Sequence, residues 1–176
     1  MASSEQGNTK AVPADRLSDF SRAILKAAGA DEATARDATR AMLHASIHGI
    51  DSHGVRLLPH YQAALSGGRL NGRPQVTFTR IKPGTGMLDA DHAHGARAIY
   101  EAVERAAELA GETGIAAVAV SNSSHFGAAG AYTLELAGRG LGGIVFGNSD
   151  SLVRLHDGAK RFHGTNPISV AFPTAR

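Results

Sequence analysis

Apolar residues in the first third of the chain recur every three or four positions, which is the period of an amphipathic helix. An aspartate precedes the first two of these stretches, as a capping residue does, and glycines end them. The pattern predicts helices from Asp15 to Gly29, from Asp31 to Gly49 and from just after Ser52 to Gly67. We therefore expect a helical unit over residues 15–72, preceded by a polar, disordered tail over residues 1–14.

Beyond residue 73 the pattern becomes that of short strands mixed with helices. Short apolar or alternating runs predict strands over residues 75–81, 87–90, 115–120, 143–146 and 168–172. Helical periodicity returns over residues 95–110 and 129–137. A strand, a helix and a strand in succession imply that strands 115–120 and 143–146 pair in parallel through a right-handed crossover. The predicted fold class is a mixed α/β (α+β) architecture.

The composition is that of a globular protein with an aliphatic core. Hydrophobic residues make up 43% of the 176 positions, whereas aromatic residues make up 5% and tryptophan is absent. The formal net charge of +2 is too balanced to favour nucleic acid or a membrane surface as a partner. Because cysteine is absent, disulfides and thiolate metal sites are excluded. No stretch approaches the roughly 20 apolar residues of a membrane span, and the start lacks a secretory pattern, so we expect a cytoplasmic protein.

Three glycines imitate a dinucleotide-binding fingerprint. Gly138, Gly140 and Gly143 fit G-x-G-x-x-G, but the fingerprint must follow a strand and open a helix so that backbone amides meet the pyrophosphate. Here the glycines close a predicted helix and lead into a predicted strand. We therefore expect a helix end and a turn, and a nucleotide would be held in another way.

Two histidine-containing loops carry the candidate chemistry. SNSSHFGAAGAY places His125 between a predicted strand and a predicted helix, among small residues that leave room for a ligand. GIDSHGVRLLPHY places His53 beside Ser52. Histidine exchanges a proton near neutral pH, so both segments favour an enzyme.

A metal site is the weaker alternative for the histidines. His44 and His48 are spaced four residues apart on a predicted helix, with His53 and His60 nearby, which is a spacing that can hold a metal ion. Only Asp51 stands near them as a further ligand. We therefore predict no metal site.

The segments DSHGVRLLPHY, NSSHFGAAGAY and GTNPISVAFP occur in this order and together resemble the malate/L-lactate dehydrogenase family of NAD(P)-dependent oxidoreductases. The resemblance runs from about Asp15 to the last residue. It implies hydride transfer between NAD(H) or NADP(H) and C2 of a small 2-oxo or 2-hydroxy acid, or of a cyclic imino acid. Residues 73–176 would then be the first part of a non-Rossmann nicotinamide-binding domain. The family's length and the open sheet edge after the last strand indicate the front part of a larger protein.

The resemblance assigns acid–base roles to the two histidine segments. His125 is the first candidate for the group that protonates the alkoxide in reduction, and His53 is the other, since the matching histidine has been given this role in related enzymes. Ser52 either contacts substrate, orients His53 or caps a helix.

Substrate and cofactor contacts follow from the same resemblance. Arg56 is the candidate carboxylate ligand, although many relatives place this arginine one residue later, which turns a helical side chain by about 100°. Tyr61 either contacts substrate or packs in the core. Ser149, Thr165, Asn166 and Pro167 are expected to line the nicotinamide side of the cofactor cleft.

The resemblance also implies a homodimer and a small-molecule substrate, while the balanced charge argues against a nucleic acid or membrane partner. One rival interpretation is a truncated, catalytically inactive relative that folds, dimerises or binds nucleotide. The other is a histidine-based metal protein.

Overall fold

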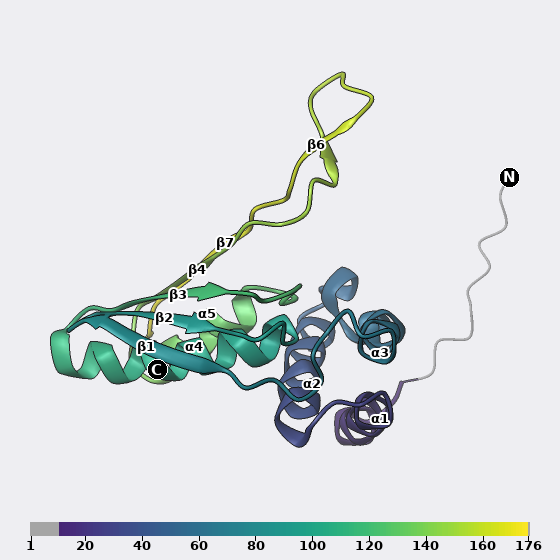
Figure 1. Cartoon of the computed structure of the whole chain (residues 1–176), viewed down its shortest axis with the longest axis horizontal. Helices are drawn as coiled ribbons and strands as arrows, with labels where there is room; N and C mark the ends of the chain where they lie inside the picture. Colours follow the sequence, from purple (N-terminus) through teal and green to yellow (C-terminus); the bar gives the residue numbers. More distant parts are fainter. Residues whose placement is uncertain (1–10, 176) are drawn as a thin grey trace, which may run out of the picture.

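The computed structural model describes residues 11–175, so most of the predicted tail, residues 1–10, lies outside the described part. The chain is helical up to residue 66, and from residue 77 on it combines short strands with helices (Figure 1). The helices are α1 (Ala14–Ala27), α2 (Glu32–Ile47), α3 (Leu58–Ser66), α4 (Gly95–Thr113) and α5 (Gly130–Gly138), with short 3₁₀ turns η1 (Asp51–His53) and η2 (Val55–Leu57). The strands are β1 (Thr77–Lys82), β2 (Thr85–Asp89), β3 (Ala117–Ser121), β4 (Gly143–Phe146), β5 (Val153–Arg154), β6 (Arg161–His163) and β7 (Ile168–Ala171).

Capping signals explain where the first two helices begin and end. The Asp31 carboxylate accepts a hydrogen bond of 2.7 Å from the backbone N–H of Thr34, as an N-cap residue does. Gly29, at a φ of +105°, reverses the chain after α1. Asp15 is not the cap of α1, because the helix begins one residue earlier and Pro13 stands at the N-cap without a side-chain bond. Asp15 instead lies in the first turn, where a carboxylate favours the helix dipole.

The third predicted helix begins later than the pattern suggested. Two short turns, η1 and η2, occupy most of residues 51–57, and α3 starts only at Leu58. Pro59 gives the physical reason, because proline lacks a backbone N–H and is tolerated only in the first turn of a helix. The helix therefore cannot extend backward to Ser52.

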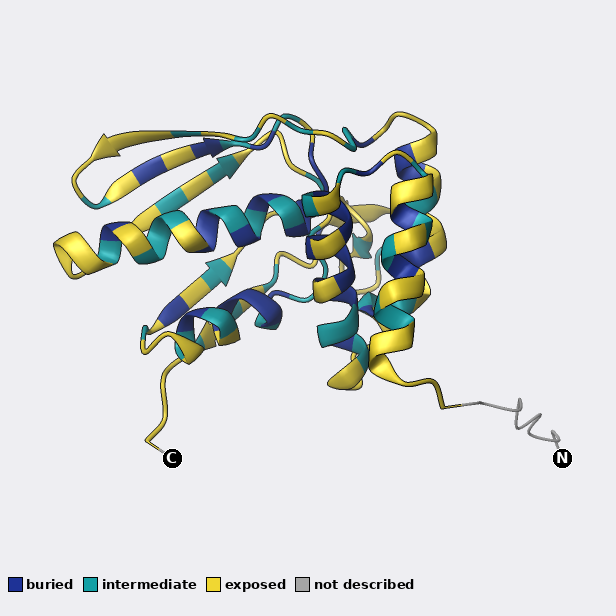
Figure 2. Ribbon diagram, turned by 90° about the horizontal axis from the view of Figure 1, so that it is seen from below, coloured by how far each residue is buried: buried dark blue, intermediate teal, exposed yellow. Residues whose placement is uncertain are grey.

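The first sheet joins three strands in the order β1-β2-β3. Strands β1 and β2 form an antiparallel hairpin, and β2 pairs in parallel with β3 across α4. Helix α4 covers one face of this sheet with its buried side while its other side is exposed (Figure 2). Val118 and Val120 of β3 point into this interface and join a cluster around Leu88.

The predicted parallel pairing of β3 with β4 is wrong. Strand β4 pairs with β7 in a separate antiparallel sheet. Helix α5 packs against β4 and β7 on one side and against α4 on the other. Because α5 packs on α4 and not on β3, the strand after it, β4, lies in a different layer from β3.

The three glycines of the imitated fingerprint form a helix end, as expected. Gly138 is the last residue of α5, Gly140 has a φ of +79° in the turn, and Gly143 begins β4. A helix, α5, directly precedes them and a strand, β4, directly follows, so the phosphate-binding arrangement is absent from this part of the described chain.

Residues 147–167 form an arm that leaves the body between β4 and β7 (Figure 1). The short antiparallel pair β5 and β6, which the sequence pattern did not predict, lies in this arm. Its apolar side chains Leu152, Leu155 and Phe162 are exposed. Among the described helices, none has the length and apolar character needed to cross a bilayer.

Candidate active site

The loop after β3 holds His125 against the start of α4. The backbone N–H of Gly95 donates to Ser124 Oγ at 3.1 Å, and this hydroxyl donates to the carbonyl of Ala93, also at 3.1 Å. A Cβ atom at Gly95 would stand 2.6 Å from the carbonyl group of His125, so only glycine permits this approach. The backbone of His125 is therefore fixed by α4 rather than by its own loop alone.

His53 lies on the 3₁₀ turn η1, beside Ser52. The hydroxyl of Ser52 stands 2.8 Å from Nδ1 of His53, which supports the role of Ser52 in orienting that ring. The turn is fixed to α2 because the backbone N–H of Val55 donates to Ser46 Oγ at 2.9 Å. Gly54 is buried there, and a Cβ atom would stand 3.3 Å from the backbone nitrogen of Ser46.

Tyr61 connects the two histidine segments. Its hydroxyl lies 2.7 Å from Nδ1 of His125, and the rings of His53 and His125 stack with centroids 5.5 Å apart. Tyr61 is buried, and burial raises the pKa of its phenol well above the ordinary 10.0, so the phenol keeps its proton. Nδ1 of each histidine is thus engaged by a hydroxyl, and Nε2 is the nitrogen left to exchange a proton.

The surroundings of His125 favour its neutral form. Although the residue is exposed overall, the protein packed around its ring lowers its pKa below the ordinary 6.5, and the positive charges of His53, His60 and Arg69 lower it further. The carboxylate of Asp150 acts in the opposite direction. An imidazolium in this position gives up its proton more readily than one in water.

The sequence analysis missed His94, which lies directly beneath Tyr61. It is the N-cap residue of α4, and its Nδ1 accepts a hydrogen bond of 3.1 Å from the backbone N–H of Ala96. Its ring meets the ring of Tyr61 edge to face, with centroids 4.2 Å apart. Histidine is not among the preferred N-cap residues, so no pattern in the sequence marks this position.

The two arginines near the site differ in their surroundings. Arg56 lies on η2, is exposed, and forms no hydrogen bond or ion pair within residues 11–175. Arg69, which the sequence analysis also missed, donates to Nε2 of His60 at 3.1 Å, and its charge lowers the pKa of His125. Of the two arginines, Arg69 is therefore the one that interacts with histidines of the site, His60 and His125, within residues 11–175.

The predicted cofactor residues meet at the base of the arm. The hydroxyls of Ser149 and Thr165 lie 3.1 Å apart. The backbone N–H of Ser149 donates to Asn166 Oδ1 at 3.1 Å, and the backbone N–H of Asn166 donates to Ser149 Oγ at 3.2 Å. These bonds join Ser149 to Thr165 and Asn166, which lie 16 and 17 positions further along the chain, into one polar cluster.

This polar cluster borders the His125 loop. The carbonyl of Pro167 accepts a hydrogen bond of 3.3 Å from the backbone N–H of Gly147, where the arm begins. A Cβ atom at Gly147 would stand 3.2 Å from the ring of Phe126, the residue after His125. The predicted cofactor residues and the predicted proton donor therefore share one region of the surface.

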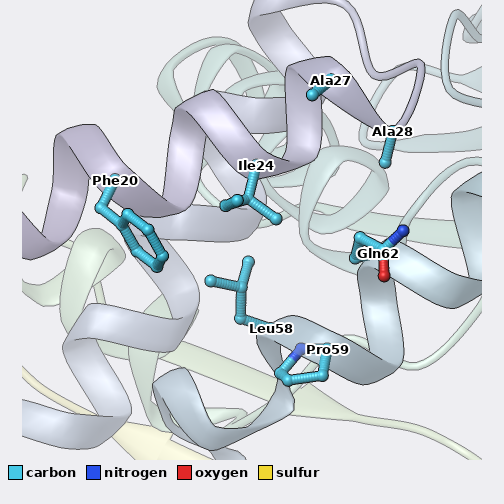
Figure 3. A pocket seen from close by; sticks show the side chains of 7 residues that line it. All are labelled: Phe20, Ile24, Ala27, Ala28, Leu58, Pro59 and Gln62. Carbon is cyan, nitrogen blue, oxygen red and sulfur yellow. The ribbon is translucent and has the colours of Figure 1, made fainter.

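A hollow of about 390 Å³ lies elsewhere, between α1 and α3 (Figure 3). Seven residues line the hollow, most of them apolar, and none of them is a predicted site residue: Phe20, Ile24, Ala27, Ala28, Leu58, Pro59 and Gln62.

His44 and His48 stack on each other with ring centroids 4.2 Å apart. Within the described part of the chain, no three side chains of histidine or acidic residues form a group that could hold a metal ion.

Together, these groups can bind a small acid and exchange a proton with it. Nε2 of His125 or of His53 can donate to an oxygen, Arg69 or Arg56 can pair with a carboxylate, and the hydroxyls at the base of the arm can bind an amide.

Comparison with known proteins finds relatives over nearly the whole chain. Residues 12–176 match the family described as Malate/L-lactate dehydrogenase. The chain is 39% identical over 163 residues to a malate dehydrogenase of Pyrococcus abyssi, which covers 93% of this chain and 45% of the relative. It is 37% identical over 153 residues to a (2R)-3-sulfolactate dehydrogenase (NADP(+)) of Chromohalobacter salexigens, which covers 86% of this chain and 45% of the relative.

The fold has the same relatives. The solved structure of malate dehydrogenase from Pyrococcus horikoshii OT3 superimposes with a TM-score of 0.91 at 35% sequence identity, and the match covers 97% of this chain and 49% of that chain. The chain therefore spans about half the length of the proteins that it matches.

Proposed function

The chain belongs to the malate/L-lactate dehydrogenase family, and from this premise we propose that it transfers a hydride between NAD(P)H and C2 of a small 2-oxo or 2-hydroxy acid, or of a related imino acid. The observation that carries the proposal is the hydrogen bond of 2.7 Å between the Tyr61 hydroxyl and Nδ1 of His125, whose ring stacks on that of His53. This hydrogen bond leaves Nε2 of His125 free to exchange a proton, and the charge of Arg69 lies near enough to lower the pKa of His125.

In the reduction, His125 acts as the proton donor. Reduced nicotinamide, when bound, supplies the hydride that adds to C2, and the electron pair of the carbonyl moves to oxygen. Nε2–H of the His125 imidazolium gives its proton to this oxygen, and the ring becomes neutral. The proton on Nδ1 stays in place because the Tyr61 hydroxyl oxygen accepts it as a hydrogen bond. The oxidation runs through the same groups in reverse.

The base of the arm is the proposed site for the nicotinamide. Ser149, Thr165 and Asn166 offer hydroxyl and amide groups that remain exposed, and each hydroxyl has bonding capacity beyond the bonds within the cluster. Such groups fit the carboxamide of nicotinamide, which needs both a donor and an acceptor. Pro167 holds the cluster beside the His125 loop through Gly147.

A second candidate is an inactive relative that binds nucleotide without turning it over. The observation that favours it is the length, since the chain spans about half of its relatives. The homodimer, which the family resemblance implies, also belongs to the proposal, and so does the cytoplasmic location expected in the sequence analysis. Sedimentation of the purified chain measures the first of these.

Binding and turnover distinguish the two candidates. Fluorescence titration of the chain with NADH and NADPH measures binding, and loss of reduced-nicotinamide absorbance with pyruvate, oxaloacetate, diketogulonate or a cyclic imino acid measures turnover. We expect saturable binding of at least one nucleotide and turnover of at least one substrate. Binding without turnover by the folded chain would support the inactive relative, and absence of both would reject the two candidates together.

A further inference from the structure

We infer that His94 is a positioning residue, whose ring holds Tyr61 in place and through Tyr61 fixes the orientation of His125. The inference rests on the proposed function only for the role of His125 as proton donor. It concerns a residue that touches neither substrate nor cofactor in that proposal.

His94 is buried at the N-terminal end of α4. The ring is completely enclosed, with 1% of the residue exposed, at the point where α4 begins. Its Nδ1 accepts the N–H of Ala96, so the ring proton must be on Nε2. This Nε2 finds no hydrogen-bond partner within residues 11–175. The neutral ring is further stabilised by its burial, which lowers the pKa of His94 to about 3.

Capping of α4 alone does not explain a histidine at position 94. An N-cap needs one acceptor atom, and serine, aspartate or asparagine supplies it without burying a second polar group. A buried N–H without a partner is unfavourable, and a native structure retains one where another demand requires it. The demand that the structure shows is a flat ring at this place.

The ring of His94 contacts Tyr61, and through Tyr61 it reaches His125. Tyr61 stands edge to face on His94 with centroids 4.2 Å apart, and the Tyr61 hydroxyl reaches Nδ1 of His125. The same start of α4 also holds the His125 backbone, through Gly95. One end of one helix thus fixes His125 twice, by its backbone directly and by its ring through His94 and Tyr61.

Two substitutions separate the cap from the ring. His94→Asn keeps an acceptor for the N–H of Ala96 but removes the ring, whereas His94→Phe keeps a ring against Tyr61 but removes the acceptor. His92→Asn is the matched control, because His92 is exposed on the same segment and its φ of +58° suits asparagine.

The readout is the pKa of His125, measured from its imidazole resonances by NMR titration of the whole chain. Groups that face His125 and stay unchanged in these variants are His53, His60, Arg69 and Asp150. In His94→Asn, Tyr61 is expected to shift into the vacated space and let water reach His125, so that the pKa of His125 rises toward 6.5. In His94→Phe and His92→Asn the pKa is expected to stay at its native value.

A double-variant cycle checks that the effect passes through Tyr61. Tyr61→Ala, which removes the whole ring and opens the same space to water, should raise the pKa of His125 in the same direction, and adding His94→Asn should produce no further rise. An unchanged His125 pKa in His94→Asn, or additive effects of the two changes, would overturn the inference. If His94→Asn does not fold, a shifted pKa in folded His94→Phe would overturn it equally. Since the titration needs no turnover, its outcome is separate from that of the proposed function.

Discussion

Individual side chains divide the work of the site between elements that are distant in the sequence. Tyr61 and His125 are 64 positions apart, yet their contact decides which imidazole nitrogen is left for chemistry. His94 and Arg69 join them from two further segments. At this scale, we expect that changing one atom or one charge alters the proposed proton transfer or binding and leaves the fold intact.

The choice between two arginines is the first prediction at the residue scale. Loss of a charge-assisted hydrogen bond to a carboxylate costs about 1.5–3 kcal/mol, or about 10- to 150-fold in affinity. We expect Arg69→Gln to raise KM for the 2-oxo acid by about this factor, because Arg69 is the arginine whose charge reaches His125. Arg56→Gln is the matched change on the exposed turn η2 and should leave KM near its native value. Steady-state kinetics that show the reverse order would return the role to Arg56.

The pH dependence of stability is the second prediction at this scale. The pKa of His94 is about 3 in the fold and about 6.5 in an unfolded chain. Below pH 6.5 the unfolded state therefore takes up a proton that the folded state does not, and stability falls as the pH falls. From pH 6.5 to pH 5 this one group should lower the free energy of unfolding by about 2 kcal/mol.

Urea unfolding at pH 7 and pH 5 measures this contribution. The native chain should lose more stability between the two values than His94→Asn does, by about 2 kcal/mol. His92→Asn should behave as the native chain, since its side chain is exposed. Equal losses in the native chain and in His94→Asn would show that His94 does not titrate as the structure implies.

Single elements place these side chains, and α4 has the largest part. Its first residue, Gly95, lets the His125 loop approach, while the residue before it, His94, supports Tyr61. The rest of the helix covers β2 and β3 and contacts α2 and α5. The start of α4 is therefore the place where packing of the body and geometry of the site meet.

Two glycines of α4 give a matched test of this role. In Gly95→Ala the new Cβ atom would meet the His125 carbonyl at 2.6 Å, so the loop must move, at a cost of about 1–3 kcal/mol. Gly111→Ala adds its methyl group to open space and should stabilise the helix by about 0.5–1 kcal/mol. Denaturant unfolding measures both, and the His125 resonances should shift only in Gly95→Ala. Equal stability of the two variants would contradict the close approach.

The elements that the sequence predicted are those decided by a few neighbouring residues. Asp31 caps α2 and Gly29 ends α1, as local rules require. The start of α3 differs from the prediction because Pro59 is tolerated only in the first turn of a helix, although the helical period of apolar residues continues before it. The partner of β4 was missed because it depends on which side of α4 receives α5, and no local pattern encodes that choice.

The site shows the same division. The two histidine loops stood out because each puts histidine among small residues between regular elements. The hydrogen bond of Tyr61, the contact of His94 and the approach of Arg69 arise only when residues 61–69 come to lie against the start of α4 and the His125 loop. Side chains that act through other side chains leave no spacing in the sequence.

At the scale of the whole molecule, the chain is about half as long as the relatives it matches, and the match covers nearly all of it. The outer face of the β4–β7 sheet carries the exposed apolar side chains Ile144, Phe146, Ile168 and Val170. The proton-transfer groups, by contrast, all come from the body between η1 and the His125 loop. The account therefore places the proton chemistry in the part of the family fold that this chain contains.

The most direct test of this account compares His125→Ala with His53→Ala in the oxidation of reduced nicotinamide. For each variant, circular dichroism verifies the fold and fluorescence titration measures nucleotide binding. The account predicts that His125→Ala loses turnover by about 100-fold or more while it still binds nucleotide, and that His53→Ala keeps a larger share of the native rate. Native turnover in folded His125→Ala would contradict the account. Loss of turnover in His53→Ala alone would assign the role of proton donor to His53.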